Sequence, residues 1–169
     1  KVSVHFVDEA GKTIKTVRVL RGQGIAAADL SSLIDPTPYG YNNVRYYIGN
    51  QEYTGGGHFT ADETRVTVTF TDSITYTITY NLDGGTANPA NETSYTVESN
   101  AITLNNPTKT GYTFTGWSGT GLNGKKITVT IPSGSTGDKS YTANWTPATY
   151  TVTLNAVGGK INSGNVTNY

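Results

Sequence analysis

The chain contains no cysteine and no methionine, and each absence narrows what it can do. Without cysteine there is no disulfide, no thiolate metal site and no cysteine nucleophile. Only 14% of the residues are charged and the formal net charge is zero, so no basic field exists to attract nucleic acid. The lack of methionine even at position 1 favours the interpretation that these residues are a piece of a longer protein.

Long apolar stretches are absent too, since no run approaches the roughly 20 residues that a membrane helix needs. We therefore expect no membrane insertion by these residues, and we find no signal peptide or anchor motif. What the chain has instead is 20 glycines, 12 tyrosines and many threonines and asparagines. Threonine and tyrosine favour pleated surfaces, whereas glycine and asparagine favour tight turns. This composition predicts an all-β or an α+β, β-rich fold with many hairpins.

The segment 1–72 predicts a small unit with one helix. The expected elements are strands at 1–7 and 13–20, a helix at 25–34, strands at 44–48 and 51–54, and a closing strand at 65–71. Val2, Val4 and Phe6 alternate and share the inner face of the first strand. Residues 55–57 are all glycine, which predicts a flexible loop. The resulting ββαββ order is that of a β-grasp-like (ubiquitin-like) unit, in which one helix covers a short mixed sheet.

The pattern then restarts. The expected strands lie at 76–81, 93–97, 102–104, 112–117, 127–131 and 141–145. Within the fourth of these strands, Tyr112 and Phe114 share a face, and Gly116 breaks the alternation before Trp117. A glycine at such a break predicts a bulge that re-aims the tryptophan.

A third copy begins at Tyr150. Residues 150–155 repeat 76–81, and the glycine pair at 158–159 repeats the pair at 84–85, an offset of about 74 residues in both cases. We therefore predict three divisions: a divergent unit at 1–72, a complete repeat at 73–147 and the first hairpin of a further repeat at 148–169. An isolated hairpin is marginal. We expect this one to pack on the second unit, or to associate with another molecule through the edge strand at 149–169.

Three segments of the second unit carry a family resemblance. They are the sequence YTITYNLDGG at 76–85, PTKTGYTFTGW at 107–117 and YTANW at 141–145. Residues 75–146 thereby resemble the Listeria–Bacteroides repeat family, known also from the B-repeat of internalin-type surface proteins, and 149–169 resemble the start of another copy. Residues 1–72 match only in element order, and they are equally similar to a mucin-binding-like module.

The resemblance implies β-grasp-like units in tandem on secreted or wall-anchored bacterial proteins. Such repeats serve as stalks or spacers and as weak adhesion or protein-interaction modules. The family has no catalytic residue or cofactor to carry over, so the resemblance implies a non-catalytic, extracellular module at the bacterial cell surface.

The residues themselves offer little for catalysis, and we expect no enzyme, no metal and no cofactor. His5 and His58 are the only histidines, and neither belongs to a nucleophile motif. The carboxylates fall at predicted turns, where aspartate bends and caps the chain. Asn91 begins a glycosylation sequon by pattern, which matters only in a eukaryotic host.

The first unit is unusually rich in tyrosine. The candidate partner-binding residues are Tyr39, Tyr41, Tyr46, Tyr47 and Tyr53. Tyr46 and Tyr47 are adjacent in a predicted strand, so one of them must face outward. Exposed aromatic rings can stack on a sugar or anchor a protein, so the expected partner is a glycan or a protein at the cell surface. The alternative is that these tyrosines cover a thin sheet and leave their hydroxyls in water.

Overall fold

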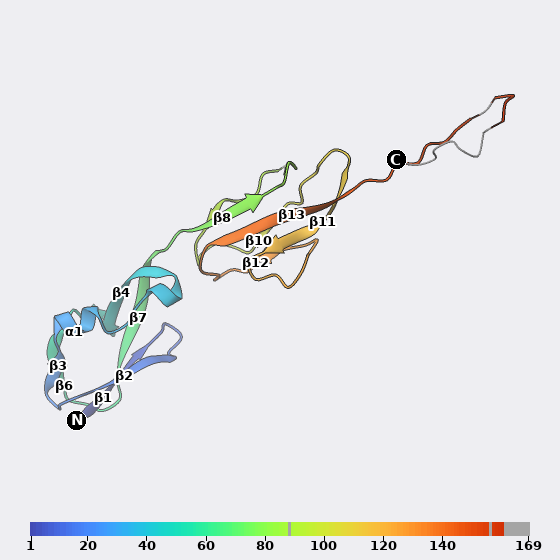
Figure 1. The fold of residues 1–169 in the computed structure, drawn as a ribbon. Coiled ribbons are helices and arrows are strands. Elements are labelled where there is room, and N and C mark those ends of the chain that lie inside the picture. The colour runs from blue at the N-terminus through green and yellow to red at the C-terminus, as the bar shows by residue number, and fades with distance from the viewer. Residues whose placement is uncertain (88, 156, 161–169) are drawn as a thin grey trace. The chain divides into compact units, whose positions relative to one another are not determined.

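The computed structural model describes residues 1–87, 89–155 and 157–160. These residues are rich in strands, which form several small sheets (Figure 1). The contacts between residues divide the chain into two compact units. The first unit comprises Lys1–Thr77, Ser94–Ala101 and Pro132–Asp138, and the second comprises 78–93, 102–131 and the chain from 139 onward. The three repeat boundaries inferred from the sequence stay a prediction.

The first unit is built on a five-stranded sheet in the order β2-β1-β7-β4-β5. The strands are β1 (Val2–Val7), β2 (Thr13–Val19), β4 (Tyr41–Ile48), β5 (Gln51–Glu52) and β7 (Thr64–Ser73). The central neighbours β1 and β7 run parallel, and the other pairs are antiparallel. The long connection between β2 and β4 makes this parallel pairing possible, because parallel strands need a crossover.

The core of this unit follows from alternation. Val2, Val4 and Phe6 are fully buried, as the sequence predicted, and Val66 and Val68 face them from the neighbouring β7. Leu30, in the connection between β2 and β4, is buried in the same apolar cluster. Period-2 patterning therefore fixed which face of each strand points inward.

The predicted helix at 25–34 exists but is shorter. Helix α1 (Ala27–Ser31) has five residues, and a 3-10 turn, η1 (Thr37–Tyr39), follows it. Ile25 is instead the last residue of β3 (Gln23–Ile25), where it pairs with Gly56. At the other end the Ser31 hydroxyl donates to the carbonyl of Ala28. Such local bonds compete with the helical ladder, so the helix ends before the apolar periodicity does.

The prediction of a flexible loop at 55–57 was wrong. Gly56 begins β6 (Gly56–Phe59), which pairs antiparallel with β3. The backbones approach so closely that a Cβ on Gly24 would lie 1.8 Å from the carbonyl oxygen of Gly56. Glycine is therefore required at position 24, because the two chain segments touch there. A single sequence does not show this contact, so the glycine run at 55–57 could not be distinguished from a mobile loop.

A second sheet has the order β11-β13-β8-β9, and β10 pairs separately with β12. The strands are β8 (Tyr76–Asn81), β9 (Ser94–Tyr95), β10 (Ile102–Thr103), β11 (Tyr112–Gly119), β12 (Thr130–Ile131) and β13 (Lys139–Pro147). The first residues of β8 pair with β9 in the first unit, and the later ones pair with β13 in the second.

The two sheets share one topology. The order β9-β8-β13-β11 repeats β2-β1-β7-β4, with the same parallel pair at its centre. The small pair β10–β12 likewise corresponds to β3–β6. The opening strands β1 and β8 start at Val2 and Tyr76, so they are separated by one period of the sequence repeat. That period is therefore also a period of the strand order, although residues 1–72 match the other copies only weakly in residue type.

The predicted bulge before Trp117 is confirmed. The register of β11 against β13 shifts between Phe114 and Gly116, and Gly116 has a φ of 124°. Trp117 is fully buried as a result, whereas Tyr112 at the start of the strand is exposed. The second arm of the hairpin predicted at 148–169 lies outside the described residues.

Candidate functional site

The five candidate tyrosines lie in different environments. Tyr46 is 4% exposed and packs edge-on against Phe6, with ring centroids 5.5 Å apart, so its ring cannot meet a partner. Burial also raises the pKa of Tyr46. Tyr47, its neighbour on β4, is half-buried. Of this adjacent pair the structure assigns Tyr46 to the core, which corrects its place among the candidates.

Tyr53 has a structural role. Its hydroxyl accepts a hydrogen bond from the backbone N–H of Ile25 at 3.0 Å and donates one to the carbonyl of Gly56 at 2.8 Å. Its ring packs edge-on against Phe59. The half-buried Tyr53 therefore joins the β5–β6 connection to β3 and has no free hydroxyl to offer.

Tyr39 and Tyr41 both stack on Phe70, which the sequence did not single out as a candidate partner-binding residue. Phe70 of β7 stacks on Tyr39 at 4.4 Å between ring centroids and on Tyr41 at 5.8 Å, with interplanar angles of 21° and 18°. We call Tyr39, Phe70 and Tyr41 the aromatic stack. Strand alternation puts Phe70 on the same face of β7 as the buried Val66 and Val68, but Phe70 itself is only half-buried.

Two hollows flank the aromatic stack. One, of about 310 Å³, is lined by Asp8, Glu9 and Tyr41, and the other, of about 220 Å³, by Asp8, Lys12 and Tyr39. Phe70 lines both hollows. Tyr39 is 45% exposed, so this part of the first unit presents an accessible aromatic ring beside carboxylates.

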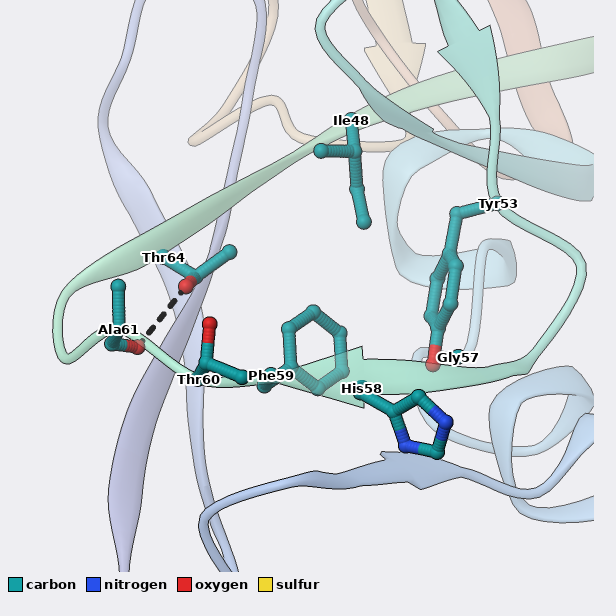
Figure 2. A pocket seen from close by; sticks show the side chains of 8 residues that line it. All are labelled: Ile48, Tyr53, Gly57, His58, Phe59, Thr60, Ala61 and Thr64. Atoms are coloured by element: carbon teal, nitrogen blue, oxygen red, sulfur yellow. Dashed lines mark hydrogen bonds between the residues drawn. The ribbon is translucent and has the colours of Figure 1, made fainter.

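A third hollow, of about 260 Å³, lies between β6 and the end of β4 (Figure 2). Ile48, Tyr53 and Phe59 line it with apolar surface. Figure 2 shows His58 and Phe59 on opposite sides of β6, as strand alternation requires. His58 Nδ1 lies 2.6 Å from the carbonyl oxygen of Gly22 and so donates to it. The hollow is therefore a shallow apolar depression whose single histidine is bound to backbone.

The other histidine is also held by neighbouring side chains. His5 Nδ1 lies 3.0 Å from Thr16 Oγ1, and Nε2 lies 2.8 Å from a carboxylate oxygen of the exposed Glu63. The His5 side chain is 21% exposed. This arrangement fixes the imidazole across β1 and β2 but pairs it with a solvated carboxylate. In residues 1–87, 89–155 and 157–160, no group of three or more His, Asp or Glu side chains is placed to hold a metal ion.

Two aspartates hold the first strands of the two sheets. Asp62 Oδ1 accepts the backbone N–H of Ser3 at 2.9 Å, and Asp138 Oδ1 accepts that of Thr77 at 2.8 Å. Each carboxylate precedes the closing strand of its sheet, β7 or β13. The acceptors lie 59 and 61 residues from the amides they bind, so these carboxylates join distant segments, whereas the expectation was that they cap and bend the chain locally. Their shared role extends the topological repeat to individual hydrogen bonds.

The residues of the three sequence motifs form the framework of the second unit. Trp145 Nε1 donates to the carbonyl of Leu82 at 3.1 Å, and Lys109 Nζ donates to that of Asp83 at 2.6 Å. Both bonds hold the turn between β8 and the following segment. Trp117 Nε1 donates to Asn106 Oδ1 at 3.0 Å. These side chains are thus bound within the fold.

The side chain of Asn91, the asparagine of the sequon, is also hydrogen-bonded within the fold. Asn91 Oδ1 accepts the backbone N–H of Asn105 at 2.6 Å, and Asn91 Nδ2 donates to the carbonyl of Asn105 at 3.0 Å. The reciprocal pair satisfies the backbone of a segment outside any strand. The side-chain amide of Asn91 is therefore occupied by the fold itself.

Residues 76–144 match the family model of the Listeria-Bacteroides repeat domain. The resemblance predicted from the three motifs is confirmed for this segment. Repeat domains of this family are generally non-catalytic and are associated with bacterial surface proteins. A comparison with curated proteins found no match. In the part of the chain that the structure describes, no helix has the length and apolar character needed to cross a lipid bilayer.

Proposed function

We propose that this chain is a non-catalytic, extracellular module of a bacterial cell-surface protein, made of β-grasp-like repeats in tandem and acting as a stalk or spacer. The family match at 76–144 supports the surface-repeat assignment. The strand order β2-β1-β7-β4-β5, with a parallel central pair and a helix after β2, supports the β-grasp-like fold of the first unit. The related order β9-β8-β13-β11 supports its repetition.

The main support for this proposal is that residues of the family motifs make contacts within their own repeat. Gly85, Lys109, Trp117 and Trp145 contact the backbone or core of their own repeat. A sequence motif whose lysine and tryptophan side chains are bound in this way specifies a fold rather than a reaction. A repeated fold whose copies follow each other in sequence serves to extend a protein.

Small-angle scattering on a series of chains tests the spacer role. The present chain is compared with one lengthened by a complete further repeat, a second copy of residues 76–149 placed after Thr149. A spacer predicts that the maximum dimension grows when the repeat is added. A maximum dimension that stays nearly constant, as for repeats that collapse on one another, would contradict the proposal.

A second candidate function is glycan binding through the aromatic stack. The exposed Tyr39 ring beside Asp8 favours it, because sugars stack on aromatic faces and donate hydroxyl hydrogen bonds to carboxylates. A protein partner is the other class of ligand that exposed aromatic surface serves, in keeping with an adhesion role like that of internalin-type proteins.

A printed glycan array identifies the ligand for this second function, and Tyr39→Ala tests the site. The expected result is at least tenfold weaker binding of any glycan found. Tyr112→Ala is the matched control, because Tyr112 is equally exposed, at 44%, but lies in the second unit. Unchanged binding by Tyr39→Ala, or no bound glycan, removes the proposed site.

A further inference from the structure

We infer that the exposed surface around Gly111 and Tyr112, at the start of β11, is the docking surface for the next repeat of the array. The inference rests on the proposed tandem function and names the contact by which successive repeats join. It follows from a comparison of two equivalent positions, Gly40 before β4 and Gly111 before β11.

The two glycines share one local geometry. Gly40 has a φ of 84° and Gly111 a φ of 77°, and a tyrosine that begins a strand follows each of them. The carbonyl of Gly40 accepts the N–H of Ile74 at 2.9 Å, and that of Gly111 accepts the N–H of Ala148 at 2.9 Å. Ile74 and Ala148 each lie just before the position where the next copy of the sequence starts. In both copies the outgoing chain is thus tied to the same glycine.

At Gly40 this surface is covered. A Cβ built on Gly40 would lie 2.1 Å from Val97 Cγ1 and 3.3 Å from Thr136 Cγ2, and both residues belong to the first compact unit together with Gly40. The Val97 carbonyl also accepts the N–H of Gly134, which joins the two covering segments. A side chain of any size at Gly40 would displace this contact, so glycine is needed for close approach as well as for its φ.

The same segment also lies near Tyr41, which follows Gly40. Burial raises the pKa of Tyr41, and the negative charges of Glu98 and Glu9 raise it further. Glu98 follows Val97 directly, so the covering segment brings both an apolar contact for the glycine and a carboxylate for the tyrosine.

At Gly111 the same surface is open. A Cβ built there would have no atom of the described residues within 4 Å, and Tyr112 is 44% exposed. Lys109 Nζ lies 4.4 Å from the centroid of the Tyr112 ring and 3.4 Å from Oδ2 of Asp83, so the lysine beside the tyrosine is already paired with a carboxylate. The open surface around Gly111 therefore matches in shape the surface that Val97 and Thr136 cover at Gly40.

The repeat in the sequence indicates which segment would cover Gly111. Residues 150–155 restart the repeat, and the positions one repeat period after Val97 and Thr136 fall beyond residue 169. Covering segments for Gly111 would thus have to come from a complete further repeat that starts at Tyr150. A further repeat of the same kind, joined covalently through Ala148, is the partner this surface fits.

Tyrosine nitration by tetranitromethane, read by mass spectrometry, tests the inference in the lengthened chain described above. In the added copy the tyrosine that corresponds to Tyr112 is replaced by phenylalanine, so that only the original Tyr112 is read. We expect nitration of Tyr112 to fall at least fivefold relative to the original chain, to about the level of Tyr41. Tyr39, which is 45% exposed in the first unit, should react equally in both chains. Unchanged nitration of Tyr112 overturns the inference. Protection of Tyr112 in the original chain that grows with its concentration also overturns it, by naming a second copy of the whole chain as occupant.

Two glycine variants sharpen the result. Gly111→Ala should restore nitration of Tyr112 in the lengthened chain, because the new methyl group would meet the covering segment. Gly124→Ala is the matched control, since Gly124 has a φ of 78° and equally open surroundings. It should leave Tyr112 protected. If scattering shows extension while Tyr112 stays reactive, the spacer function stands and this docking contact is wrong; failure of extension itself would count against the proposed function.

Discussion

Gly85 lies so close to the indole of Trp145 that a Cβ on the glycine would be 2.5 Å from Cζ2 of the ring. Trp145 in turn donates to the carbonyl of Leu82, and Lys109 holds the carbonyl of Asp83. The turn after β8 and the closing strand β13 are therefore fitted to each other. This fit explains why glycine, lysine and tryptophan occur together in the motifs of the second unit.

Gly85→Ala should destabilise the second unit by about 1–3 kcal/mol, because an added methyl group overpacks the contact with Trp145. The φ of Gly85 is not in the left-handed region, so the cost comes from the ring and not from backbone strain. Urea unfolding followed by tryptophan fluorescence measures it. The double variant with Trp145→Phe should recover part of the loss. Additive effects of the two substitutions would contradict the contact.

Trp117→Ala should cost about 3–5 kcal/mol, since Trp117 is fully buried and donates to Asn106. The remaining tryptophan, Trp145, reports the unfolding of the same unit. Tyr112→Ala on the same strand is the control, and we expect it to change stability by about 0.5 kcal/mol because its ring is exposed. Equal losses for the two variants would show that Trp117 is not the core of this sheet.

Asp138→Ala should lower stability by about 0.5–1.5 kcal/mol through loss of the bond to the N–H of Thr77. Asp138→Asn keeps an acceptor oxygen and should lose less. Hydrogen exchange at the Thr77 amide gives a local readout, with faster exchange expected in Asp138→Ala. Asp62→Ala should instead speed exchange at Ser3, the equivalent amide of the other sheet. Unaltered exchange at both amides would rule out the shared role.

Stability should fall in the alkaline range because of Tyr80. Burial, with smaller contributions from Tyr141 and Glu92, raises the pKa of Tyr80 from 10.0 to about 12. Between these values the unfolded chain has released the phenol proton and the folded chain has kept it, so the free energy of unfolding decreases as pH rises from about 10 to about 12. Chemical denaturation across this range measures the slope, and Tyr80→Phe should reduce it. A slope that is identical in Tyr80→Phe would show that Tyr80 does not contribute.

Where the expectations failed, the missing information was long-range. A run of glycines at 55–57 is compatible with a flexible loop and with a strand. Gly56 is part of a strand because the distant segment that contains Gly24 pairs with it. The predicted helix began at Ile25, but Ile25 pairs with Gly56 and therefore belongs to β3. Tyr46 and Tyr47 could not be ranked from sequence, because either parity of the strand is possible until β7 provides the register.

The sequence by itself determined the local features: the alternation that buries Val2, Val4 and Phe6, the turns at aspartate and glycine, the bulge before Trp117, the repeat period and the family motifs. These depend on residues close together in the chain, where side-chain period and φ preference act directly. Only the tertiary structure decided that both sheets share one strand order, that Phe70 gathers Tyr39 and Tyr41, and that Gly40 is covered while Gly111 is open. Those outcomes depend on which distant segments pack together. The side-chain pattern of one segment does not specify which other segment it will contact.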